Sequence, residues 1–205
     1  MKRPLWARAV SAVFHPFLMP LFTLVTLFAV DEVLHQQPAM FLYFAFILLV
    51  NTLGAAVSLF LMYRRGLIGD LDIRNRGERW LPFTVVLVYY VMTLFVLESG
   101  DAVHTPPLYV GMLRGVVAAI ATAIVITQRF KLSMHLLGVG GLVGAVFAAG
   151  QIHFTPHLSA LALWIGIAGL VGASRLALRV HREEEVYAGF LWGAVVVYLA
   201  VMWTV

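Results

Sequence analysis

The sequence contains no cysteine. This absence excludes disulfide bonds, metal sites built on thiolates and a cysteine nucleophile. Charged residues are also scarce, at 12% of the 205 residues, whereas apolar residues make up 62%. No internal repeat, low-complexity segment or polar linker divides the chain. The composition therefore excludes an ordinary soluble domain, and it leaves the seven histidines as the residues best suited to unusual chemistry.

Long apolar runs separated by short polar stretches predict an all-α polytopic membrane protein, a bundle of about seven transmembrane helices. We expect one integral membrane domain over residues 1–205. The basic start resembles a signal peptide, but the apolar run after it is too long for one, so we interpret it as a retained first span. The expected spans are 9–30, 39–63, 81–97, 108–127, a fifth opened by residue 135, 158–172 and 186–205.

Three polar islands interrupt these spans, at residues 66–79, 129–135 and 174–185. Counting crossings places all three at the face that also carries the amino terminus, together with every lysine and arginine except Arg114. The positive-inside rule then predicts that this face is cytoplasmic. In a soluble protein a net charge of +4 would suggest nucleic acid. Basic residues that flank apolar spans instead favour membrane lipids and a phosphorylated substrate as partners.

Some polar and small residues lie inside the expected spans. His15, followed by Pro16, is expected to be a packed, hydrogen-bonded interior residue rather than a ligand, and the two prolines of this span should loosen its helix. Arg114 should face the bundle or extend to the membrane surface. The spacing of four glycines in the fifth span predicts close helix packing; these are Gly138, Gly140, Gly141 and Gly144.

The third island combines a hydroxyl, a histidine and carboxylates. If it is helical, Ser174, His181 and Glu185 are spaced at i, i+7 and i+11 and lie within about 20° of one stripe. Glu183 and Glu184 are rival acids if the helix breaks after His181. The alternative is a solvated loop whose basic residues hold the membrane surface. We interpret five arginines as such anchors: Arg64, Arg65, Arg129, Arg179 and Arg182.

Arginines beside two histidines and a carboxylate favour phosphoryl chemistry. Guanidinium groups match the spread charge of a phosphate and stabilise the charge that builds up as phosphorus is attacked. One histidine can attack phosphorus while the other protonates the leaving oxygen. This set requires no metal and no cofactor. A different use of the histidines would be haem ligation, for which His15, His135 and His181 are the candidates.

In order and spacing, the islands resemble the motifs of the type 2 phosphatidic acid phosphatase superfamily, integral membrane lipid phosphatases that work through a phosphohistidine. The third motif of that family, Ser-Arg, five residues, His, three residues and Asp, is reproduced from Ser174 to Glu185 with Glu for Asp. The second, Pro-Ser-Gly-His, is matched by residues 132–135 without the proline and the glycine. The resemblance covers about residues 70–190.

The first motif of the family is a lysine six residues ahead of Arg-Pro. Here Arg79 matches its arginine, Asp72 lies at the position of the lysine, and the proline is displaced by two residues to Pro82. Arg74 or Arg76 could substitute for the lysine in a shifted register. The first motif is therefore the loosest of the three.

The resemblance implies that His181 is the nucleophile, Glu185 its orienting acid and His135 the general acid to the leaving group. The residues that it implies for holding phosphate are Arg175, Arg79, Ser133, Ser174 and either Arg74 or Arg76. The implied enzyme is a metal-independent hydrolase of lipid metabolism that acts on a lipid phosphate such as phosphatidic acid or on a polyprenyl diphosphate. A phosphotransferase and a non-catalytic homologue that binds phosphorylated lipids are the alternatives. The implied location is the cell (inner) membrane. Sites of this family usually face away from the cytoplasm, whereas the charge count predicts a cytoplasmic site.

Overall fold

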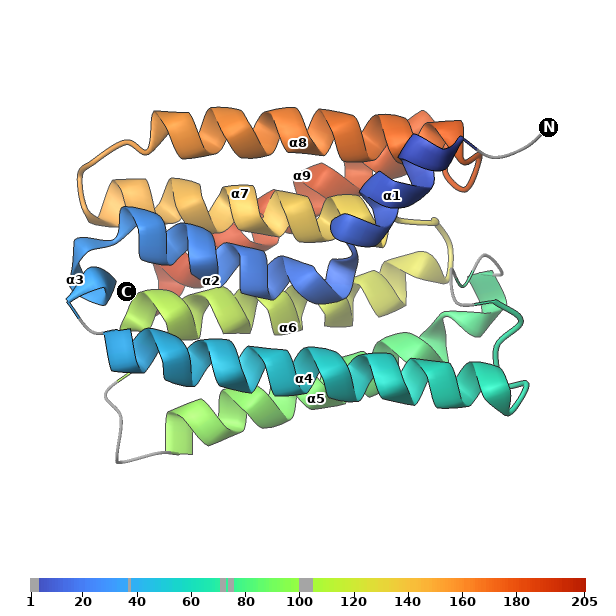
Figure 1. The fold of residues 1–205 in the computed structure, drawn as a ribbon, viewed down its shortest axis with the longest axis horizontal. Helices are drawn as coiled ribbons and strands as arrows, with labels where there is room; N and C mark the ends of the chain where they lie inside the picture. The colour runs from blue at the N-terminus through green and yellow to red at the C-terminus, as the bar shows by residue number, and fades with distance from the viewer. Residues whose placement is uncertain (1–3, 37, 71–72, 74–75, 100–104) are drawn as a thin grey trace.

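The protein is a bundle of helices that run side by side (Figure 1). The computed structural model describes residues 4–36, 38–70, 73, 76–99 and 105–205, and no strand occurs among them. The helical elements in these ranges are α1 (Leu5–Val13), η1 (Pro16–Leu18), α2 (Met19–Val30), α3 (Glu32–His35), α4 (Pro38–Arg64), η2 (Arg76–Glu78), α5 (Trp80–Ser99), α6 (Pro107–Thr127), α7 (Met134–Ile152), α8 (Leu158–Ala177) and α9 (Glu183–Thr204).

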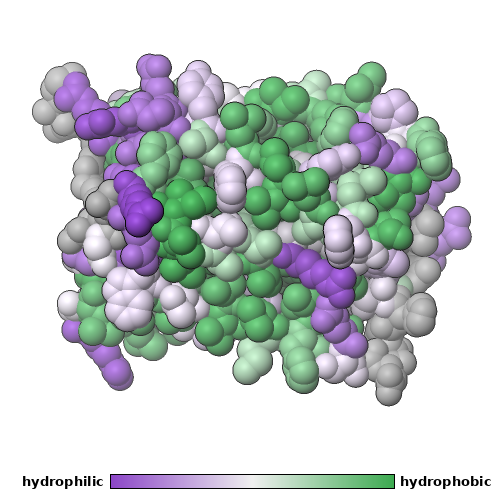
Figure 2. All heavy atoms as spheres, turned by 180° about the vertical axis from the view of Figure 1, so that it is seen from behind, coloured by the Kyte–Doolittle hydropathy of each residue, from purple (hydrophilic) through white to green (hydrophobic). Residues whose placement is uncertain are grey.

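Within these described ranges, seven helical stretches are long and apolar enough to cross a membrane, as the sequence predicts. On the face drawn in Figure 2, apolar residues cover most of the middle, while hydrophilic residues gather mainly toward the two ends. Large apolar side chains face outward along the spans; Phe46 and Phe95, for example, are each 65% exposed. Exposure of so much apolar surface to water would be unfavourable, whereas the apolar chains of lipids can cover it.

The first span is two helices rather than one. α1 ends at Val13, His15 has extended backbone with ψ 140°, and η1 leads into α2. Pro16 and Pro20 lie at the start of η1 and α2, where a missing backbone N–H is tolerated, and each would clash with a continuous helix one turn earlier. The predicted loosening of this span is thus confirmed, and it takes the form of a complete break.

α7 forms the core of the bundle. Of its membrane-spanning window 72% is buried, compared with at most 44% in any other span. α9 packs directly against it, because a Cβ atom at Gly140 would collide with the carbonyl oxygen of Phe190, and one at Gly144 with that of Ala194. The predicted packing role of these two glycines is confirmed. The amino-terminal end of this buried helix carries His135.

Candidate active site

The three polar islands lie at the same end of the bundle, where α4 and α6 end and α5, α7 and α9 begin (Figure 1). A cavity extends from this end into the bundle, and its empty space, including the open solvent at its mouth, is about 1140 Å³. Its wall contains the side chains of Arg79, His135, Arg175 and His181, together with His15 from the first span. Most of the remaining wall is apolar and comes from α2, α5, α6 and α7. Four of the site residues predicted from the three islands therefore line one space.

The third island is not one helix, so the predicted stripe of Ser174, His181 and Glu185 is wrong. α8 continues past its expected end to Ala177, the chain turns through Arg179 at φ 54°, and α9 begins at Glu183. Three consecutive glutamates in the first turn of α9 favour a helix start there, since carboxylates stabilise the positive end of the helix dipole. The turn, rather than helical periodicity, brings His181 to Glu185.

His181 and Glu185 form a close pair. His181 Nδ1 lies 2.7 Å from Glu185 Oε2, and their side chains are only 3% and 14% exposed. The same oxygen accepts the backbone N–H of Arg182 at 3.3 Å, which fixes the carboxylate at the start of α9. A carboxylate accepts, so Nδ1 carries the proton and the lone pair of neutral His181 is on Nε2. The rival Glu184 lies on the surface, 3.8 Å from Arg182, so the structure selects Glu185 as the partner of His181.

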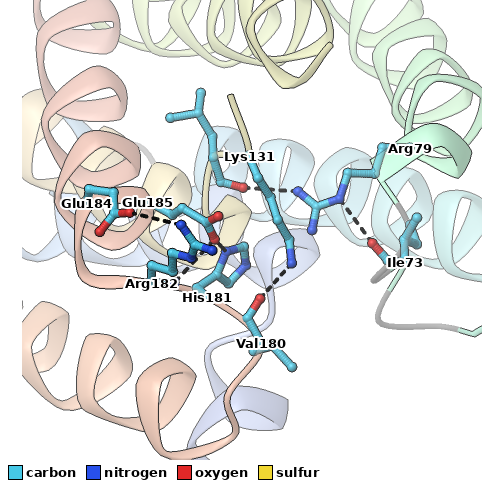
Figure 3. Close-up of polar contacts among 9 residues, drawn as sticks. Ile73, Arg79, Lys131, Val180, His181, Arg182, Glu184 and Glu185 are labelled. Atoms are coloured by element: carbon cyan, nitrogen blue, oxygen red, sulfur yellow. Dashed lines mark hydrogen bonds and ion pairs between the residues drawn. The ribbon is translucent and has the colours of Figure 1, made fainter. Parts of the chain in front are cut away.

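Positive charges surround His181. Burial, together with the charges of Arg175, Lys131 and Arg79, lowers the pKa of His181 from 6.5 to about 2, and burial is the largest of these causes. Lys131 donates from Nζ to the carbonyl of Val180 at 2.7 Å, and in the view of Figure 3 it lies between Arg79 and the His181–Glu185 pair. Sequence reasoning did not assign Lys131 to the site. Because its pKa is lowered this far, the imidazole of His181 is neutral in the free protein, and its lone pair is available for nucleophilic attack.

Arg79 joins the first two islands. It is 4% exposed and donates from Nε to the carbonyl of Ile73 at 3.0 Å and from Nη1 to that of Leu132 at 3.1 Å (Figure 3). The pKa of Arg79 is lowered to about 10, mainly by burial. The charge of Glu185 raises this pKa and the charge of Arg175 lowers it, so both side chains act electrostatically on Arg79. The remaining candidates of this island, Arg74, Asp72 and the side chain of Arg76, lie outside the described residues.

The second island lies against the third. The backbone N–H of Ser133 donates to the carbonyl of Glu185 at 3.1 Å, and Gly189 lets α9 approach, since a Cβ there would collide with the carbonyl of Ser133. The Ser133 hydroxyl is fully buried and has no hydrogen-bond partner in the part of the chain that the structure describes. His135 Nε2 lies 3.1 Å from the carbonyl of Ser11, and because a carbonyl only accepts, this nitrogen carries a proton.

The first span adds residues that sequence reasoning missed. Ser11 Oγ accepts from Arg175 Nη1 at 3.1 Å and lies 3.1 Å from Ser174 Oγ, which donates to the carbonyl of Val171. His15 accepts the backbone N–H of Phe17 at Nδ1, so it is packed and hydrogen-bonded as expected, but it also lines the cavity. In the sequence, the only signal for this contribution of the first span was Pro16, which follows His15.

Outside the site, Arg114 faces Glu98, with Nη2 2.8 Å from Oε1 and a side chain 46% exposed. Among the described residues, no group of three or more histidine, aspartate or glutamate side chains is placed to hold a metal ion. Comparisons with protein-family models, with curated proteins and with solved structures find no match for the chain.

Proposed function

We propose that the protein is a membrane lipid phosphatase of the type 2 phosphatidic acid phosphatase superfamily, acting through a phosphohistidine formed on His181. One observation carries the proposal. A buried neutral histidine, held by a carboxylate through Nδ1, lines the same cavity as two arginines and a second histidine. Each group meets one requirement of phosphoryl transfer to nitrogen. His181 offers a lone pair, the two arginines offset the negative charge of the phosphate, and His135 is the acid for the leaving group.

In the first half-reaction the Nε2 lone pair of His181 attacks phosphorus, and the bond between phosphorus and the lipid oxygen breaks. The leaving oxygen takes a proton from His135 and departs as an alcohol, or as a monophosphate if the substrate is a diphosphate. The Ser11 carbonyl occupies Nε2–H of His135, so the transferred proton comes from Nδ1. The neutral ring of the substrate-free protein takes up this Nδ1 proton from solvent when the negatively charged substrate binds. Glu185 accepts from Nδ1 of His181 throughout and stabilises the positive charge that forms on the ring.

In the second half-reaction a water oxygen attacks phosphorus and gives its proton to the now neutral His135. The phosphorus–nitrogen bond breaks, phosphate leaves, and both histidines return to their starting states. Arg79 and Arg175 face the phosphate from the cavity wall, where low polarity strengthens their attraction for developing negative charge. Every proton is returned, and the residues need no outside reactant except water.

The shape of the cavity favours a lipid over a soluble phosphate ester. Its charged side chains lie at one end, and the wall further in is formed by apolar residues such as Val86, Ile120 and Leu142. An amphiphile with an anionic head and a hydrocarbon chain matches both parts of this wall. The distribution of basic residues supports a site at the cytoplasmic face of the cell membrane.

The test is phosphate release from phosphatidate and from a polyprenyl diphosphate in detergent with EDTA. Wild type should release phosphate. After a quench with acid that is too brief to hydrolyse phosphohistidine, the wild-type protein should also carry covalent phosphate that is stable to alkali. His181→Ala should do neither, and His135→Gln should slow release about a hundred-fold or more. His153→Gln, at the opposite end of the bundle, is the matched control and should behave as wild type. Absence of release and of covalent phosphate in wild type would overturn the hydrolase and favour a lipid-binding protein.

A further inference from the structure

The broken first span reaches into the site at the end where the cavity carries its charged residues. α1 packs on the turn that bears His181, because fully buried Ala7 clusters with Leu178 and Val180. After the break, α2 packs equally closely on α7, where a Cβ atom at Gly138 would lie 2.7 Å from Met19 Cγ. The break therefore lies between two firmly packed segments, and its position is fixed by both of them.

Ser11, in the last turns of α1, contacts both histidine-bearing parts of the site. Its hydroxyl accepts from Arg175 Nη1 at 3.1 Å, and its carbonyl accepts from His135 Nε2 at 3.1 Å. The serine is 8% exposed, so water does not compete strongly for these bonds. One residue of the first span thus holds the guanidinium that the third island supplies and the imidazole that the second island supplies.

The hydrogen bonds around Ser11 have a defined direction. Ser174 donates its proton to the carbonyl of Val171 at 2.7 Å, so its oxygen is an acceptor toward Ser11 at 3.1 Å. Ser11 then donates to Ser174 and accepts from Arg175. Such a chain, running from the guanidinium to the α8 backbone, polarises each bond in turn and fixes the orientation of the guanidinium. Alanine at position 11 would interrupt it, whereas threonine would preserve it.

His135 is held on a second side by the same span. The ring of His15 meets the ring of His135 edge to face, with centroids 5.5 Å apart. His15 has extended backbone, which the proline at position 16 favours, and it lies just after the end of α1 at Val13. The carbonyl of Ser11 fixes the protonated nitrogen of His135, and the His15 ring limits its rotation.

We propose that the first span is a structural part of the active site, with Ser11 as a positioning residue that aims Arg175 at the substrate phosphate and sets the tautomer of His135. The inference deepens the proposed function and rests on it for the identity of the phosphate. In this role the first span is not only a membrane anchor. It supplies a fourth segment to the site, in addition to the three polar islands.

The binding test measures the affinity of purified protein in detergent for vanadate by calorimetry. Ser11→Ala should weaken vanadate binding roughly ten-fold, because a hydrogen bond to a charged group is lost. Ser11→Thr should restore binding to near the wild-type value. Ser58→Ala is the matched control, since Ser58 also makes one hydrogen bond between spans, to Tyr89 Oη at 3.0 Å, and should bind as wild type. Wild-type affinity in Ser11→Ala would overturn the positioning of Arg175.

A second measurement is independent of phosphate binding and of activity. Nitrogen-15 spectra of histidine-labelled wild type, with His135 assigned by comparison with His135→Gln, should show a neutral ring protonated at Nε2. A ring protonated at Nδ1 would overturn the bond to the Ser11 carbonyl. If wild type binds no vanadate but the spectrum shows Nε2–H, the proposed function fails while the contact of the first span with His135 stands.

Discussion

At the scale of single residues, the three consecutive glutamates at the start of α9 differ sharply in position. Glu185 contacts His181 at 2.7 Å, whereas the side chain of Glu184 is 59% exposed. Glu185→Ala should lower kcat about a hundred-fold or more, since the nucleophile loses its orienting acceptor and the group that stabilises its positive charge. Glu184→Ala removes the same charge from the neighbouring position and should leave kcat near wild type. Equal losses in the two variants would contradict the assignment of Glu185.

A second residue-scale prediction concerns His181 and acid stability. The folded protein holds this imidazole neutral to a pKa of about 2, whereas the unfolded chain takes up its proton near 6.5. As the pH falls below 6.5, the unfolded state gains a proton that folded His181 does not bind, so this residue lowers the free energy of unfolding by about 1.4 kcal/mol per pH unit. His181→Gln should therefore lose less Tm than wild type between about pH 7.5 and pH 5 in detergent. Parallel Tm profiles would contradict the buried, neutral state.

At the scale of helices, the spans could be predicted because apolar runs of this length have few other stable structures. The end of α8 could not be predicted from hydropathy, since its last turns carry Ser174 and Arg175, which look like loop residues unless their buried partners are known. The site was predicted through residues that share a motif, such as His181 and Glu185. Ser11 contributes through a tertiary contact more than 160 residues along the chain, and local patterns do not encode such a contact.

The contact between α7 and α9 makes an element-scale prediction. Gly140→Ala places a methyl group against the carbonyl of Phe190, and the two helices must separate to accept it. The expected destabilisation is about 1–3 kcal/mol, because overpacking a tight interface forces backbone shifts. Gly166→Ala on α8 is the matched control, since a Cβ there has nothing within 4 Å. Thermal unfolding in detergent should show a lower Tm for Gly140→Ala only, and an equal Tm for both variants would contradict the close contact.

At the scale of the whole molecule, the cavity predicts a preference for chain length. Its wall includes Met112, which a rise of 1.5 Å per residue places roughly 22 Å from the site end of α6. With each ester supplied as aqueous monomers, kcat/KM should rise from octyl to dodecyl phosphate, because each methylene moved from water into the cavity adds about 0.8 kcal/mol, and should level off once the cavity is filled. Met112→Trp should move this plateau to shorter chains. Met92→Trp, on the exposed surface of α5, should leave the plateau unchanged, and the same plateau in both variants would place the chain outside the cavity.

The orientation of the whole bundle can be decided because the chain has no cysteine, so an introduced cysteine is its single thiol. Phe154, 94% exposed in the turn between α7 and α8, marks one end of the bundle, and Glu184 marks the site end. If the basic residues set the orientation, a membrane-impermeant maleimide added to intact cells should label Phe154→Cys but not Glu184→Cys, and both should react after lysis. The site would then receive lipid phosphates from the cytoplasmic leaflet. The reverse labelling would contradict the charge count, turn the site outward, and direct the search for substrate to the opposite leaflet.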